Sequence, residues 1–274
     1  MKKLISFVIA LVLTMTNMVP TFAVESDHTI KYAEGLAYLE ANNFDSHLIE
    51  LMSMDEICEY ATAQSTQSET LYYAFIQDKD AKNVEMKAYT QYEYDALIND
   101  VQVMENNTKT LDWIRLTILS TYQGGDNYHI ACLYWWMTEP FFRWEDVVAL
   151  MFDNRIIPQS GTGNAHMSYT RSDGSFTTVD CTAGIQYVGT AAYAVFDIPG
   201  WGNTDIFGAL TMKAKINSVS GGPVSFNNWA YYAHMISPVS FGFSVAFPAE
   251  LTFSISPQEK FEVADVGLYS TYIP

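Results

Sequence analysis

Apolar residues recur at every second position along most of the chain from residue 110 onward, and this period restricts the fold more than any other feature. The clearest case is the stretch VSFGFSVAF at 239–247. Successive side chains of a strand point to opposite faces of a sheet, so this alternation predicts strands with one buried face. Several short strands separated by turn signals predict a mainly β chain. We expect a β-sandwich of immunoglobulin-like or jelly-roll style over residues 109–274.

The part of the chain before the sandwich has a different pattern. Apolar residues at helical spacing predict a helix over 29–41, and Ser53 followed by Glu56 is a capping box that opens a second helix. Two strand-like segments on either side of the sequence DKDAKN predict a hairpin, and a short acidic helix should follow it. The sequence therefore predicts a small acidic α/β region over 24–108, with helices and a hairpin.

The first 23 residues have the composition of an export signal. Lys2 and Lys3 precede the apolar run LISFVIALVL, and Thr-Phe-Ala at 21–23 fits a cleavage site. An apolar run of this length is too short to span a bilayer comfortably, so the pattern predicts a secretory signal peptide over 1–23. We therefore expect a secreted, extracellular protein with no transmembrane helix in its mature chain.

Charge and motifs exclude several classes of function. The net charge of −17 repels phosphate backbones, so we expect no nucleic-acid partner. None of the five histidines has the spacing of a metal site, and the metalloprotease, nucleophile-elbow, phosphate-loop and dinucleotide motifs do not occur. We therefore expect no metal and no cofactor.

The three cysteines leave the redox state open. Export permits a disulfide, and an odd count allows at most one within the chain. A bridge between Cys132 and Cys181 is one interpretation, and buried free thiols are the other.

The stretch LYWWMTEPFFRWEDVVAL at 133–150 combines more tryptophans and carboxylates than any other. Its first residues, together with those just before them, are apolar on both faces, as in a central strand that is covered on both sides or a strand at a lipid or partner interface. Pro140 has no backbone donor and ends strand pairing. Residues 138–146 should therefore form the corner between two strands.

The spacing Trp136-x3-Pro140-x2-Arg143-x2-Asp146 resembles a pattern found in an uncharacterised family of secreted β-rich proteins from Gram-positive bacteria. The order of parts is also similar, with a signal peptide, a short helical or hairpin region and a β-rich domain. The resemblance covers about residues 85–155 and implies the fold and an extracellular location, but no activity. Phe141, Phe142 and Trp144 stand where smaller or polar residues are commoner in that family.

Two interpretations of the corner follow. In the structural one, the Arg143 guanidinium binds the Asp146 carboxylate and nearby carbonyls, and with Pro140 they fix the turn. In the functional one, tryptophans provide stacking surfaces for a ligand and a carboxylate accepts its hydrogen bonds. The candidate ligand-binding residues are Trp135, Trp136, Trp144, Glu145 and Trp201.

No catalytic group is predicted, and the favoured function is a non-enzymatic extracellular binding or interaction module. Its expected partner is an unknown glycan or protein. One alternative is a glycan-active hydrolase or a carbohydrate-binding protein that uses the acids of the corner. Another is a pore-forming or membrane-active protein, suggested by the alternation in 239–255.

Overall fold

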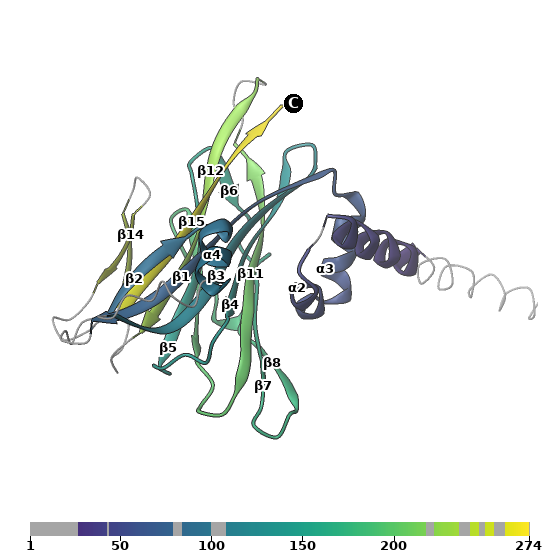
Figure 1. The fold of residues 1–274 in the computed structure, drawn as a ribbon. Coiled ribbons are helices and arrows are strands. Elements are labelled where there is room, and N and C mark those ends of the chain that lie inside the picture. The colour runs from purple at the N-terminus through teal and green to yellow at the C-terminus, as the bar shows by residue number, and fades with distance from the viewer. Residues whose placement is uncertain are drawn as a thin grey trace, which may run out of the picture. The chain divides into compact units, whose positions relative to one another are not determined.

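The computed structural model describes residues 27–42, 44–78, 84–99, 108–217, 222–235, 242–246, 250–254 and 261–273. The chain divides into two compact units, the first ending at Ala63 and the second beginning at Gln64. The signal peptide expected over 1–23 lies outside the described residues. Figure 1 shows both units.

The first unit is helical. It contains a helix over 27–41, then α2 (Ser46–Leu51), α3 (Met54–Glu59) and the short 3-10 helix η1 (Tyr60–Thr62). The predicted capping box is confirmed: Ser53 Oγ accepts from the Glu56 amide at 3.2 Å, and Glu56 Oε2 accepts from the Ser53 amide at 2.8 Å. A Cβ on Gly35 would lie 1.8 Å from the carbonyl oxygen of Ile57, so the first helix packs directly on the backbone of α3.

The second unit contains a large antiparallel sheet, which we call sheet A. Its strand order is β2-β1-β3-β4-β11-β7-β8. One more strand, β6, also pairs with β11. Figure 1 shows β1, β3, β4 and β11 side by side. The strands are β1 (Ser65–Asp78), β2 (Val84–Tyr89), β3 (Thr108–Gly124), β4 (Asn127–Trp136), β6 (Ile156–Pro158), β7 (Asn164–Thr170), β8 (Phe176–Asp180) and β11 (Thr204–Ile216).

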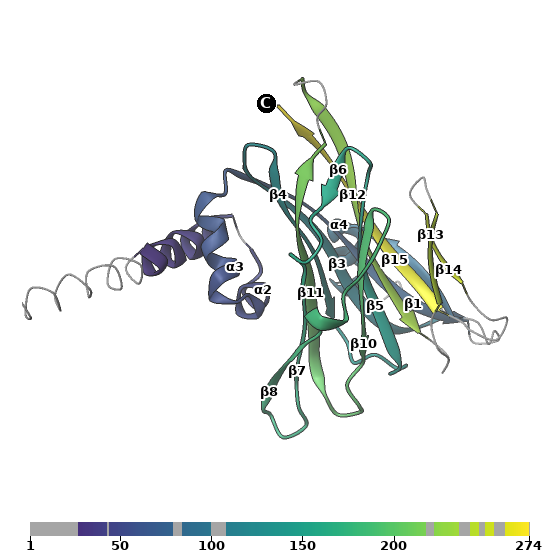
Figure 2. The same cartoon turned by 180° about the vertical axis from the view of Figure 1, so that it is seen from behind.

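A second antiparallel sheet, sheet B, has the order β15-β12-β5-β10-β9. Figure 2 shows its strands β15, β12, β5 and β10 from behind. Its strands are β5 (Glu145–Phe152), β9 (Gln186–Val188), β10 (Ala191–Asp197), β12 (Val224–Met235) and β15 (Phe261–Tyr272). The 3-10 helix η2 (Thr182–Gly184) lies between β8 and β9 in the chain.

The core lies between the two sheets. Sheet A contributes Ile114 and Leu116, and sheet B contributes Leu150 and Phe226, all of them 0% exposed. Across the interface, Tyr134 of β4 stacks on Phe196 of β10 with ring centroids 5.1 Å apart. The predicted mainly β sandwich is therefore confirmed. The central position of β4, between β3 and β11, also agrees with the prediction from its two apolar faces.

Several predicted turns are present as well. Gly124 and Gly125 connect β3 to β4 with φ angles of +93° and +63°, a region that glycine enters without steric cost. The turn Ser172–Ser175 connects β7 to β8, as its sequence predicted.

The boundary expected between 108 and 109 falls inside the sandwich. The predicted hairpin forms as β1 and β2, but β1 also pairs with β3 from Ser65↔Tyr122 to Asp78↔Thr108. The acidic helix α4 (Gln91–Asn99) packs on this sheet through Tyr94, whose ring stacks on Tyr72 at 4.2 Å. The reason for the difference is that strand pairing across a long connection leaves no local mark in the sequence.

The apolar alternation at 239–255 corresponds in part to described strands. β13 (Gly242–Ala246) and β14 (Glu250–Ser254) pair with each other from Gly242↔Ser254 to Ala246↔Glu250. They form a two-stranded sheet apart from sheets A and B. The rest of the alternating stretch lies outside the described residues.

Candidate functional site

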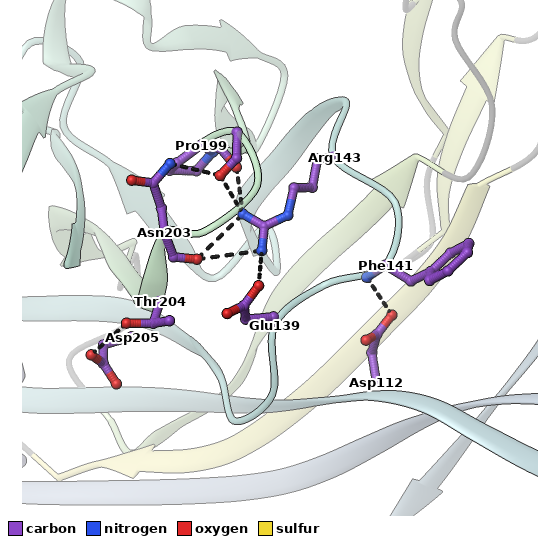
Figure 3. A network of polar contacts seen from close by, with 9 residues as sticks. Asp112, Glu139, Phe141, Arg143, Pro199, Asn203, Thr204 and Asp205 are labelled. Carbon is purple, nitrogen blue, oxygen red and sulfur yellow. Dashed lines mark hydrogen bonds and ion pairs between the residues drawn. The ribbon is translucent and has the colours of Figure 1, made fainter. Parts of the chain in front are cut away.

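The candidate site is the corner between β4, which ends at Trp136, and β5, which begins at Glu145 (Figure 3). Two contacts fix the corner to β3. The Trp113 amide donates to Thr138 Oγ1 at 2.8 Å, and the Phe141 amide donates to Asp112 Oδ2 at 2.8 Å. Asp112 is only 2% exposed, so its carboxylate anchors the turn from inside the unit.

Arg143 connects this corner to the loop that follows β10. Its Nη1 donates to the carbonyl oxygens of Pro199 at 2.6 Å, Gly200 at 2.8 Å and Asn203 at 3.3 Å. Its Nη2 donates to Glu139 Oε2 at 3.0 Å and also to Asn203 O. Figure 3 shows the guanidinium enclosed by these oxygens. The guanidinium fork thus holds two loops together, as its planar set of donors allows.

The environment of Arg143 also affects its acidity. Burial lowers the pKa of the guanidinium from its ordinary value, and the carboxylates of Glu139 and Asp112 oppose this shift. The side chain is 5% exposed, whereas that of Glu139 is 43% exposed. The pair is therefore anchored on the arginine side and open to solvent on the glutamate side.

The expected pairing of Arg143 with Asp146 is wrong, because Asp146 points into the core. Its carboxylate accepts from the Tyr232 hydroxyl and from the Met235 amide at 3.2 Å, and it lies 3.0 Å from His234 Nδ1. Asp146 and His234 are both 0% exposed, and they face each other across β5 and β12. Asp146 therefore stabilises the interior and does not brace the turn.

This buried network has further members. Trp136 Nε1 donates to the Tyr232 hydroxyl at 2.8 Å, and Trp136 is 2% exposed. Burial, and next the nearby Asp146 carboxylate, raise the pKa of Tyr232 well above its ordinary value, so its phenol stays protonated and can donate. The pairing of Asp146 with Tyr232 and His234 was not predictable, because these partners lie 86 and 88 residues from Asp146 in the sequence.

Three aromatic side chains of the corner and of the loop after β10 are exposed to solvent. Trp201 is 66% exposed, Phe141 51% and Trp144 43%. The Arg143 guanidinium carbon lies 5.0 Å from the Trp201 ring centroid, and the Phe141 ring meets Trp201 nearly at right angles with centroids 6.1 Å apart. Cation–π and edge-to-face contacts of this kind hold an exposed ring in one orientation. We call these three residues the aromatic corner.

The predicted ligand-binding residues do not all meet there. Trp144 and Trp201 belong to the aromatic corner, and Glu145 is exposed next to Trp144, opposite Asp197 of β10. Trp136 is in the core, and Trp135 points to the opposite face of β4, with the Arg115 guanidinium 4.8 Å from its ring centroid. Phe141 is not among the predicted ligand-binding residues. Its position directly after Pro140, in the turn between two strands, is the sequence signal that could have placed it in solvent.

The chemistry of the described residues is limited. Asp146 is enclosed and cannot reach a sugar outside the sandwich. Across the described ranges, no group of three or more His, Cys, Asp or Glu side chains is arranged to hold a metal ion. Cys132 and Cys181 are free in the structure, as is Cys58, and burial raises the pKa of the Cys132 thiol far above its ordinary value. Within the same ranges, no helix is long and apolar enough to span a membrane.

Comparison with known proteins gives structural likenesses only. No protein-family model and no curated protein sequence matches the chain. The collagen-binding subdomain of the Enterococcus faecalis surface protein ACE is 6% identical, with a TM-score of 0.33 over 53% of this chain and 88% of that one. The collagen-binding domain of a Staphylococcus aureus adhesin is 12% identical, with a TM-score of 0.26 over 50% of this chain and 86% of that one. The T6 backbone pilin of serotype M6 Streptococcus pyogenes is 9% identical, with a TM-score of 0.33 over 74% of this chain and 64% of that one.

Proposed function

We propose that this chain is an exported, non-enzymatic binding module that contacts an extracellular ligand through the aromatic corner, Phe141, Trp144 and Trp201. The observation that carries the proposal is that Trp201 is 66% exposed and yet held between Arg143 and Phe141. Export is supported by the composition of residues 1–23.

The exposure of these rings calls for an explanation. Large apolar side chains that are grouped on a protein surface often mark a binding site. Tryptophan and arginine are also enriched among the residues that contribute most to binding free energy. Because Arg143 fixes the loop under Trp201, little conformational entropy is lost when a ligand covers the ring. The ligand that fits best has a flat apolar face, such as a sugar ring or an apolar patch of a protein.

Direct binding tests the proposal. The chain beginning at Val24 would be incubated with insoluble cellulose, chitin and peptidoglycan, and with immobilised extracellular proteins that include collagen. We expect at least one of them to bind. The double variant Phe141→Ala/Trp201→Ala should then bind about tenfold more weakly or worse, because aromatic residues of this kind contribute 1.4 kcal/mol or more, which is about a factor of ten.

A matched control separates the corner from exposed aromatics in general. Tyr92 is 83% exposed on α4, so Tyr92→Ala should leave binding unchanged. Equal binding by the double variant and the wild type would refute the role of the corner. Release of reducing sugar from a bound polysaccharide would instead identify a hydrolase, and the non-enzymatic proposal would fail.

A further inference from the structure

We infer that the free edge of β8 is a second binding surface, which takes up an extended segment of another protein as an added strand of sheet A. This surface is independent of the aromatic corner, and the inference does not rest on the proposed function. Among the strands that the structure describes, β8 ends the order of sheet A, and all its residues except the half-buried Thr177 are exposed. An exposed strand edge presents unpaired backbone groups that another extended chain can bind.

The register shows which backbone groups face outward. At one end of the β7–β8 ladder, the Arg171 amide donates to the Ser175 carbonyl at 2.8 Å, and at the other, the Cys181 amide donates to the Ala165 carbonyl at 2.7 Å. Antiparallel pairs alternate between hydrogen-bonded and non-hydrogen-bonded. Counting inward from either end gives the same result. Within β8, the residues of the hydrogen-bonded pairs are Thr177, opposite Tyr169, and Val179, opposite Met167.

The backbone N–H and C=O groups of the alternate residues of β8 therefore point away from β7. These residues are Phe176, Thr178 and Asp180. Thr178 Oγ1 lies 2.8 Å from Ser168 Oγ, and Asp180 Oδ1 lies 3.7 Å from His166 Nδ1, so side chains hold the strand on β7. The outward groups recur at every second residue of β8, and an extended polypeptide complements such a row along its length.

The edges at β15, β2 and β9 carry protection that β8 lacks. In the middle of β15, the Tyr73 hydroxyl accepts from the Asp265 amide at 3.1 Å and donates to the Asp265 carbonyl, so both backbone groups of Asp265 are already paired. β2 presents the charged side chains of Glu85 and Lys87, and β9 has only three residues. Charges, blocked groups and short length are common ways to prevent strand addition. The sequence FTTVD of β8 has a single charge, at its end.

The partner should be another protein. Two copies of a chain with a net charge of −17 repel each other, and a pair of five-residue strands offers little contact to overcome this repulsion. The fitting segment is extended and non-acidic, with an apolar side chain facing Phe176, which is 51% exposed, and a basic one facing Asp180. A Cβ on Gly202 would lie 3.4 Å from Ser172 Cβ, so this edge begins beside the loop that carries Trp201.

Proline substitution tests the edge without breaking the sheet. Thr178→Pro removes an outward N–H and leaves the ladder to β7 intact, because proline is tolerated where its nitrogen faces solvent. Thr178→Val is the matched control, since it also removes the hydroxyl but keeps the N–H. The probe is a display library of random linear peptides selected against the chain beginning at Val24, from which the most enriched peptide is synthesised with a fluorescent label.

We expect the labelled peptide to bind the wild type and Thr178→Val alike, and Thr178→Pro about tenfold more weakly or worse. We also expect it to slow hydrogen exchange at the amides of Phe176, Thr178 and Asp180 in the wild type. The exchange experiment needs no variant, so it decides the question even if Thr178→Pro fails to fold. Peptide binding that leaves these amides unprotected would overturn the inference, as would a selection that enriches no peptide. A dimer that Thr178→Pro abolishes would assign the edge to a second copy and overturn the proposed partner.

Discussion

Replacing Arg143 with alanine should destabilise the sandwich unit by about 3 kcal/mol. The guanidinium donates to three carbonyl oxygens and one carboxylate, and its side chain is only 5% exposed. Each hydrogen bond to a charged group contributes about 1.5–3 kcal/mol net. The expected loss is smaller than the sum of these contributions. They are not additive, and the carbonyls lie on a surface loop where water can replace some of the hydrogen bonds that Arg143 donates. In a unit of this size the change corresponds to a fall in Tm of about 6–12 °C.

Urea unfolding followed by tryptophan fluorescence measures this change in the right unit. All six tryptophans follow residue 64, so the signal reports the sandwich unit and not the helical one. Glu139→Gln is the control, because the Glu139 side chain is 43% exposed and an open ion pair contributes less than about 1 kcal/mol. An unchanged midpoint for Arg143→Ala, or an equal loss for Glu139→Gln, would refute the idea that the carbonyl contacts hold the corner.

Three further predictions concern the interior. Asp146→Asn should lower the free energy of unfolding by about 2–3 kcal/mol in the same urea assay, because the hydrogen bonds of its carboxylate are fully buried. The control is the exposed neighbour, where Glu145→Gln should change stability by less than about 0.5 kcal/mol. Equal effects of the two variants would contradict this account. In a variant where serine replaces Cys58 and Cys181, Cys132 is the sole cysteine. It should resist a thiol reagent in the native protein and react fully in urea, since burial raises the pKa of its thiol. Fast reaction in the native protein would argue against burial. Gly35→Ala should reduce the helical circular dichroism signal, because its Cβ would lie 1.8 Å from the Ile57 carbonyl oxygen, and an unchanged spectrum would show that the helices can move apart.

Much of the local structure could be predicted from the sequence. The Ser53–Glu56 capping box, the turn at Ser172–Ser175 and the central strand β4 all follow from neighbouring residues whose backbone preferences and side-chain hydrogen bonds act over a few positions. The corner itself was also predictable, because Pro140 ends pairing between two apolar strands.

The partners of the corner were not predictable. Arg143 binds carbonyls 56–60 residues further along the chain, and backbone oxygens carry no sequence signature. The direction of Asp146 was also ambiguous, because β5 is buried on both faces and its apolar run has no alternation that would separate inward from outward positions. Only the register of β5 with β10 and β12, which places Asp146 opposite Phe196 and His234, turns the carboxylate inward.

The mainly β character follows from local sequence, because alternation of apolar residues is a property of each strand alone. Only the folded chain shows which tryptophans lie in the core, which lie in solvent at the aromatic corner, and that β8 is the last described strand of sheet A. These features depend on pairing between segments far apart in the chain, and burial is a property of the assembled sheets and not of any single segment.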